Sequence, residues 1–142
     1  MGNNYTLREF PPADASCFPE YATLGIDPAK VPPPAATGLY RGEPIGCAGI
    51  VVLRSGVGEG WIILRQPVNG HGVWIARTVW SLLDRWQAEG GLRRVQATIS
   101  ADHPEHAALL RLVGFQYEGP LEAYRPDGGN SWMYARVRRN VA

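Results

Sequence analysis

The sequence has few cysteines, almost no lysine, little net charge and no long apolar run. Cys17 and Cys47 are its only cysteines, which excludes a disulfide-dense scaffold, and their spacing fits no zinc motif. One of the 14 basic residues is a lysine and the net charge is +1, so no strong field favours nucleic acid or membrane. No apolar run reaches the roughly 18 residues of a membrane helix, and the first residues lack a secretory leader pattern. These absences predict a cytoplasmic protein in a reducing compartment.

Glycine and proline, in contrast, are abundant. The 142 residues include 17 Gly and 12 Pro, whereas average usage would give roughly 17 of the two together. A wholly disordered chain is excluded, because 45% of the residues are hydrophobic and five are tryptophan. The surplus therefore predicts turns, loops and special backbone positions in a folded domain. The length is typical of one domain, and we expect a single domain over residues 1–142.

The prolines gather at the N-terminus, in residues 1–38. Proline costs about 3 kcal/mol inside a helix, so only short helical pieces are expected, around 13–21 and 27–30. Asp27 before Pro28 has the pattern of a helix N-cap followed by a first-turn proline. The segment also carries apolar side chains such as Phe10 and Phe18. We therefore expect it to pack on a core formed by residues 39–138.

From residue 39 the pattern predicts alternating strands and helices. Ile75, Val79, Leu82, Leu83 and Trp86 recur at helical spacing on one face. Asp102 followed by Glu105 has the pattern of a capping box. The expected fold class is α+β (mixed α/β). Its expected strands are 39–41, 45–53, 59–64, 93–99, 115–124 and 131–138, its helices 73–89 and 103–113, and its turns 42–44, 54–58 and 126–129.

A glycine-containing loop links the strand 59–64 to the first helix. A helix N-terminus offers unpaired backbone N–H groups and a partial positive charge, and glycines let an anion approach them. Gly70 and Gly72 stand where such an anion site would be. An ordinary strand-to-helix loop with two glycines is the alternative. The glycines at 56, 58 and 60 favour a hairpin turn over a phosphate loop, because no helix follows them.

The order of these motifs resembles the GNAT (N-acetyltransferase) superfamily. The likeness rests on Gly70-x-Gly72-Val73 after an apolar strand, on the strand Val95–Ile99 with its helix, and on Gly114-Phe115. The tail 119–137 is similar to small acetyltransferase-like proteins of tailed bacteriophages. The resemblance covers residues 39–138. It implies a GNAT-like splayed mixed sheet flanked by helices, with acetyl-CoA held between the two central strands.

The resemblance also implies an activity and a cofactor site. The activity is transfer of an acetyl group from acetyl-CoA to an amine of a small molecule or protein, and a homodimer is left open. The implied strand backbone pairs with the pantetheine arm, the loop holds the pyrophosphate, and the helix 103–113 lies beside the thiol. The implied cofactor-binding residues are Trp61, Ile62, Ile63 and Leu64 in the strand and Asn69, Gly70, His71, Gly72, Val73 and Trp74 in the loop.

Acetyl transfer needs a neutral amine, so a base must remove a proton. Glu59, on the strand that leads to the loop, is our candidate base, although a solvated edge glutamate is the alternative. Tyr124 and Tyr117 are candidate acids or half-buried strand residues. His106 is a candidate acid or base, or a surface histidine. His103 and His106 have a metal-ligand spacing, but no third ligand is evident, so no metal is expected.

Three positions depart from the family pattern. Trp74 replaces a small loop residue, Leu110 replaces a tyrosine that protonates the leaving thiolate, and His103 replaces an asparagine. The first two favour an alternative, a catalytically inactive GNAT-fold binding module or virion-associated phage protein. A different acyl-CoA is a further alternative. Among the other aromatic and basic residues, we expect Trp86 in the core, Trp61 and Trp74 at the site, and Arg136, Arg138 and Arg139 at a solvated strand end.

Overall fold

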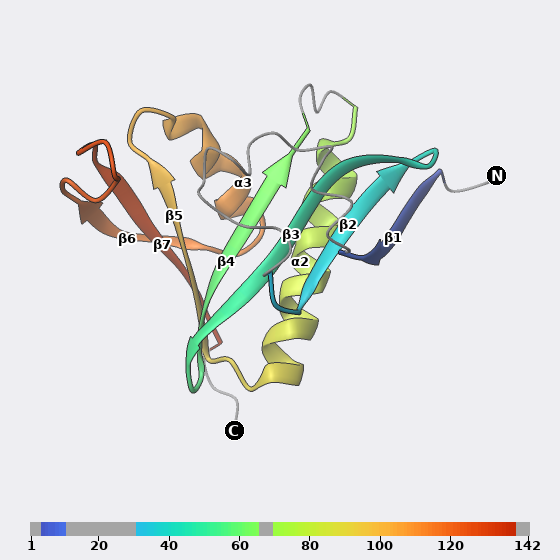
Figure 1. Cartoon of the computed structure of the whole chain (residues 1–142), viewed down its shortest axis with the longest axis horizontal. Coiled ribbons are helices and arrows are strands. Elements are labelled where there is room, and N and C mark those ends of the chain that lie inside the picture. The colour runs from blue at the N-terminus through green and yellow to red at the C-terminus, as the bar shows by residue number, and fades with distance from the viewer. Residues whose placement is uncertain (1–3, 11–30, 66–69, 139–142) are drawn as a thin grey trace. The chain divides into compact units, whose positions relative to one another are not determined.

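The computed structural model of the chain describes residues 4–10, 31–65 and 70–138 (Figure 1). The short helices expected around 13–21 and 27–30 lie outside these residues. The chain divides into two compact units. Unit 1 comprises Met1–Val51 and Gly60–Ile75, and unit 2 comprises Val52–Glu59 and Ala76–Ala142.

Seven strands are hydrogen-bonded in the order β1-β2-β3-β4-β5-β7-β6. The β4/β5 ladder is parallel, whereas the β1/β2, β2/β3, β5/β7 and β6/β7 ladders are antiparallel. The sheet is therefore mixed, which confirms the expected α+β (mixed α/β) class. No described helix is both long enough and apolar enough to span a membrane. The elements are β1 (Tyr5–Glu9), β2 (Ala35–Tyr40), β3 (Glu43–Arg54), β4 (Val57–Leu64), α2 (Gly72–Gly90), β5 (Arg94–Ser100), the 3-10 turn η3 (Pro104–His106), α3 (Ala107–Leu112), β6 (Gln116–Leu121) and β7 (Ser131–Val137).

Unit 1 contains β1, β2, most of β3, the end of β4 and the start of α2. Cys47 of β3 and Ile63 of β4 form a buried cluster, against which Phe10, Val31 and Trp61 pack. The strand β1 and the first residues of β2 lie in the segment where the prolines favoured irregular structure. Neither strand contains a proline, so both can pair with their neighbours, and the sequence prediction missed β1 and residues 35–38 of β2.

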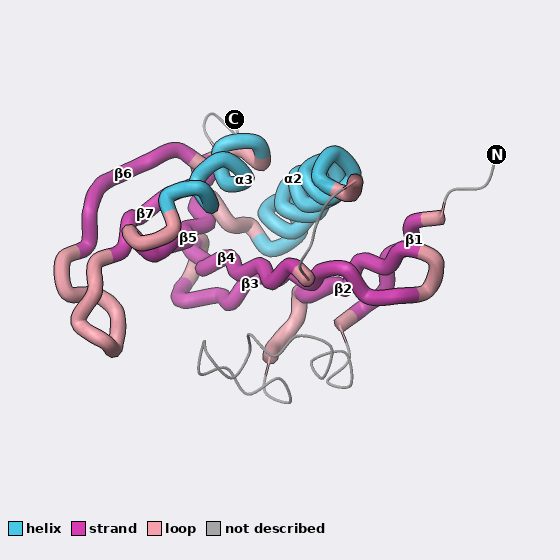
Figure 2. Tube along the Cα trace, turned by 90° about the horizontal axis from the view of Figure 1, so that it is seen from above, coloured by secondary structure: helices cyan, strands magenta, loops and turns pink. Residues whose placement is uncertain are grey.

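Unit 2 packs α3 and the C-terminal part of α2 on the same side of β5 and β7 (Figure 2). Leu82, Leu83 and Trp86 of α2 are buried, as the helical spacing predicted. In α3, Ala107 and Leu110 are buried. The apolar side chains of both helices therefore supply the core of this unit.

Arg136 of β7 corrects the prediction of a solvated strand end, because only 6% of the residue is exposed. Its guanidinium donates to the Val113 carbonyl oxygen at 2.8 Å and to Asp84 at 2.7 Å. It also donates to the side-chain oxygen of the buried Gln87 and lies 4.8 Å from the centre of the Trp80 ring. A buried guanidinium is stable here because hydrogen bonds and an ion pair replace its hydration.

Gly114, the glycine of the Gly-Phe motif, has a structural role beside this arginine. Its φ is +97°, in the left-handed region that favours glycine. A Cβ at this position would lie 2.9 Å from Arg136 Nε and 3.1 Å from the Trp80 ring. Any larger residue would therefore push on two side chains of the unit 2 core.

Two local predictions are wrong. The expected helix 103–113 begins as the turn η3, and its N-cap position is His103, which makes no side-chain capping bond. Asp102 does not cap the helix, because its carboxylate accepts a hydrogen bond from Arg125 instead. The turn expected at 42–44 is limited to residues 41–42, and Pro44 lies within β3. The contact between Asp102 and Arg125 accounts for the first difference, and the inclusion of Pro44 in β3 accounts for the second.

Candidate functional site

The strand β4 extends beyond its ladder with β5. That ladder consists of three pairs, from Val57 with Arg94 to Glu59 with Gln96, and β4 continues to Leu64. The ladder with β5 ends at Glu59, before residues 60–64. A strand backbone can pair with an added strand or an extended ligand. This segment includes the predicted cofactor-binding residues Trp61, Ile62, Ile63 and Leu64.

The loop after β4 ends at the first turn of α2. Gly70 and Gly72 are exposed, and a Cβ added to either would meet no atom within 4 Å. The Ile75 N–H bonds to the His71 carbonyl oxygen at 2.9 Å, so the N–H groups of residues 72–74 precede the first bond of the helix. The first turn contains no acidic side chain. This helix start can therefore accept an anion, and Gly70, His71, Gly72, Val73 and Trp74 all belong to it, whereas Asn69 lies outside the described residues.

Trp74 is the bulky residue at the position where the family pattern has a small one. Its indole stacks on the Tyr5 ring, with centroids 4.5 Å apart and an interplanar angle of 12°. It also lies against Gly38, where a Cβ would be 3.0 Å from the indole. The strands β1 and β2 thus accommodate the large ring. The absence of a side chain at Gly38 is what makes room for it.

His71, inside the loop, is bound by tyrosines that the sequence prediction missed. The Tyr5 hydroxyl lies 2.8 Å from His71 Nδ1 and donates to the Gly70 carbonyl oxygen at 3.4 Å. The Tyr40 ring centre lies 4.7 Å from that of His71. The sequence of β1 is too short to show a strand pattern, so it did not predict these contacts. In the structure, pairing of β1 with β2 places Tyr5 opposite Tyr40.

Trp61 packs inside unit 1. A Cβ at Gly49 would lie 2.7 Å from its ring, and its ring meets Phe10 edge to face at 5.8 Å. The indole therefore contributes to the core.

The three candidate catalytic residues lie in unit 2. Glu59 is the last residue of β4 paired with β5 and is half-buried. Tyr124 lies in the loop after β6, outside the strand predicted for it, and is 50% exposed. His106 ends η3 and is exposed. Leu110 is buried in α3, so that position offers no hydroxyl to a thiolate.

Tyr117 and His103 also lie in unit 2. Tyr117 of β6 is 54% exposed and meets Trp132 and Tyr134 edge to face.

His103 and His106 stack with centroids 5.3 Å apart, and the Glu105 carboxylate lies 3.3 Å from His103 and 3.9 Å from His106. A third metal-ligand type is therefore next to the histidine pair, contrary to the expectation. All three side chains are exposed, and contact between an imidazole and a carboxylate accounts for the arrangement.

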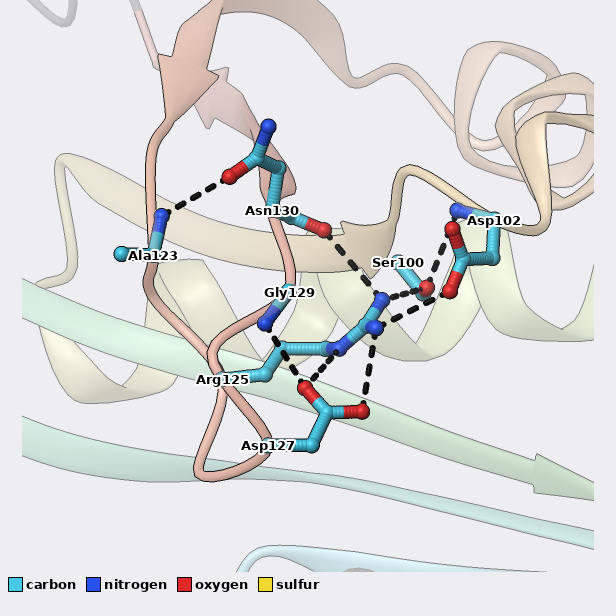
Figure 3. Close-up of polar contacts among 7 residues, drawn as sticks. All are labelled: Ser100, Asp102, Ala123, Arg125, Asp127, Gly129 and Asn130. Carbon is cyan, nitrogen blue, oxygen red and sulfur yellow. Dashed lines mark hydrogen bonds and ion pairs between the residues drawn. The ribbon is translucent and has the colours of Figure 1, made fainter.

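The loop that carries Tyr124 is tied together by Arg125 (Figure 3). Its guanidinium donates to Asp127 at 3.1 Å, to Asp102 at 2.9 Å, to the Asn130 carbonyl oxygen at 3.3 Å and to the Ser100 hydroxyl. Hydrogen bonding to Asp127 and then to Asp102 raises the pKa of Arg125. Hydrogen bonds from Arg125 and from the Gly129 N–H lower the pKa of Asp127. The sequence pattern does not indicate this network, because its members lie on two separate segments.

Comparison with solved structures identifies the fold. The GNAT-family acetyltransferase from Bacillus anthracis has a TM-score of 0.72 and 14% identity, with 96% of each chain covered. The ribosomal-protein-S5-alanine acetyltransferase from Vibrio fischeri has a TM-score of 0.74 and 15% identity, over 99% of this chain and 96% of that one. The yncA protein of Salmonella typhimurium, solved with its cofactor acetyl-CoA, has a TM-score of 0.74 and 18% identity, over 99% and 98%.

These likenesses confirm the predicted GNAT fold. They extend over nearly the whole chain. No family model matches the sequence, and comparison with curated proteins gives no match. The likeness to bacteriophage proteins stays a prediction.

Proposed function

We propose that this chain, which has the fold of the GNAT acetyltransferases, is an N-acetyltransferase that moves an acetyl group from acetyl-CoA to an amine of a small molecule or protein. The observation that carries the proposal is the open start of α2. Two exposed glycines precede or begin a 19-residue helix whose first turn has no acidic side chain. A solved protein of the same fold contains acetyl-CoA. A diphosphate is an anion that the backbone N–H groups at a helix N-terminus can bind, so the open start of α2 supports the proposal.

The residues of unit 1 would hold acetyl-CoA. The N–H groups at residues 72–74 would donate to the diphosphate, and Gly70 and Gly72 would let it approach. The backbone of residues 60–64 would pair with the amide groups of the pantetheine arm. Bound acetyl-CoA supplies an acetyl group activated as a thioester. The stacked Trp74 no longer argues against the site, because β1 and β2 accommodate its ring.

The candidate catalytic residues of unit 2 would move protons. A primary amine with a pKa of about 10.4 is protonated near pH 7, so a base must remove a proton before it attacks. We assign this to Glu59, directly or through water. Tyr124 would donate a proton to the leaving thiolate, since Leu110 cannot. His106 is the alternative donor.

A binding module without turnover is the second candidate function. The buried Leu110 favours it, because the position that often carries the acid has only an apolar side chain. The two functions differ in one measurable respect: the module would bind acetyl-CoA without transferring the acetyl group.

The loop assignment can be tested by adding a negative charge at Gly70. Acetyl-CoA at 100 times its Kd should stabilise the wild-type chain by about 2.7 kcal/mol, or about 5–10 °C in Tm. Gly70→Asp should abolish this shift, because a carboxylate repels the diphosphate. Gly42→Asp is the matched control, since Gly42 is also exposed, open and at positive φ (+81° against +85°). Equal shifts in both variants would refute the loop assignment. No shift in wild type would refute the proposed function.

A further inference from the structure

The loop between β6 and β7 is joined to the end of β5 by the side chain of Arg125 and by a backbone hydrogen bond from the Ala101 N–H to the Asn130 carbonyl oxygen at 3.0 Å. Arg125 is 22% exposed in its side chain, whereas its partners Asp102 and Asp127 are 73% and 67% exposed. Within its own loop it contacts Asp127 and the Asn130 carbonyl oxygen. Across to the other segment it contacts Ser100, the last residue of β5, and Asp102 (Figure 3).

The backbone on both sides of Tyr124 is fixed. Ala123 has a φ of +52°, which is unfavourable for a residue with a Cβ, and its N–H donates to the Asn130 side-chain oxygen at 2.8 Å. The Arg125 N–H donates to the Gly129 carbonyl oxygen at 3.0 Å, and the Gly128 N–H donates back to the Arg125 carbonyl oxygen at 2.8 Å. An unfavourable φ persists only where surrounding contacts hold it.

Asp102 comes directly before the segment that carries His106. The contact between Arg125 and Asp102 therefore joins the two segments on which the candidate proton donors Tyr124 and His106 lie. We propose that Arg125 is a positioning residue, which fixes the loop carrying Tyr124 against the segment 100–106 so that the tyrosine can act in acetyl transfer. This inference rests on the proposed acetyltransferase function.

The chemistry requires an arginine rather than any cation. Nε and one terminal nitrogen each donate to an oxygen of Asp127 at 3.1 Å, and the same terminal nitrogen reaches Asp102 at 2.9 Å. The other terminal nitrogen serves Ser100 and the Asn130 carbonyl oxygen. A planar fork can meet these partners together, whereas a lysine ammonium offers a single point of attachment. Arg125→Lys therefore keeps the charge and removes the geometry.

The test compares two arginines of unit 2 that both form bidentate contacts. Arg125→Lys should lower kcat at least tenfold, with the KM for acetyl-CoA within a factor of two of wild type. The matched control is Arg94→Lys, because Arg94 donates to both oxygens of Glu118, at 2.8 and 2.6 Å, without touching the Tyr124 loop. This control should keep the wild-type kcat. Amide hydrogen exchange at Ala123 and Gly129 should rise at least tenfold in Arg125→Lys only.

A double variant separates positioning from general stability. Tyr124→Phe should lower kcat by itself, and adding Arg125→Lys should then cause little further loss, because the arginine acts through the tyrosine. Additive losses, a wild-type kcat in Arg125→Lys, or unchanged exchange at Ala123 would each overturn the inference. A wild-type chain that binds no acetyl-CoA and shows no turnover would instead refute the proposed function, a result distinct from these.

Discussion

The two units of this chain hold their candidate functional loops by different physical means. In unit 1 the loop before α2 is held by ring contacts among Tyr5, Tyr40, His71 and Trp74, with one hydroxyl bond to His71. In unit 2 the loop after β6 is held by the guanidinium of Arg125 and two carboxylates. The ring contacts place no permanent charge beside the start of α2, where an anion would bind. Charged contacts provide direction and geometry, but salt screens them when they are exposed.

Unit 2 also contains the opposite case, a buried guanidinium. Arg136 is 6% exposed, whereas the Arg125 network lies at the surface. The same functional group therefore supports the core in one place and orients a loop in another. Burial decides how much each arginine contributes to the free energy of unfolding. A buried group that loses its partner cannot form a hydrogen bond to water instead, so the loss costs more.

The largest expected effect is at Arg136. Arg136→Leu should lower the free energy of unfolding by about 3 kcal/mol, because it leaves buried Gln87 and the Val113 carbonyl oxygen without their donor. Urea unfolding followed by circular dichroism measures this loss. Arg138→Leu, two residues along the chain, is the control and should change stability by less than about 0.5 kcal/mol. Similar losses of stability in Arg136→Leu and Arg138→Leu would show that the burial of Arg136 does not cause the effect.

A smaller effect is expected at the ring cluster of unit 1. Tyr5→Phe keeps the stack on Trp74 and removes the hydroxyl bond to His71, so it should cost about 1 kcal/mol. Tyr5→Ala also removes the ring and should cost about 2 kcal/mol. Differential scanning calorimetry of both variants, with and without 0.5 M NaCl, measures these losses. A strong salt dependence would contradict the apolar character assigned to this cluster.

The smallest effect concerns the pH dependence of the Arg125 network. The pKa of Asp127 is lowered from its ordinary value of 3.8, so its stabilising contribution is fully present above that value and is lost as pH falls through the lowered pKa. The stability curves of wild type and Asp127→Asn should therefore differ by a constant amount above about pH 4 and begin to converge as pH falls below that value. Urea unfolding between about pH 2 and 6 checks this. A constant difference across that range would exclude the ion pair as its source.

Much of the fold and part of the candidate site were predictable from local patterns. Helical spacing predicted α2 and the burial of Trp86, and the glycines at 70 and 72 marked the helix start that the structure contains. The predictions failed where a distant partner decides the outcome. Asp102 has a capping pattern but binds Arg125. Arg136 has the pattern of a solvated strand end but is buried against α2 and the end of α3.

The sequence by itself determined the order of strands and helices from residue 39 onward, the glycine loop at the start of α2 and the absence of a strong charge field. These properties depend on residues within a few positions of one another or on composition. Only the tertiary structure decided that Trp74 stacks on Tyr5, that Gly114 lies against Arg136, and that Arg125 joins the Tyr124 loop to β5. Each of these contacts connects separate segments, so folding rather than local sequence brings the partners together.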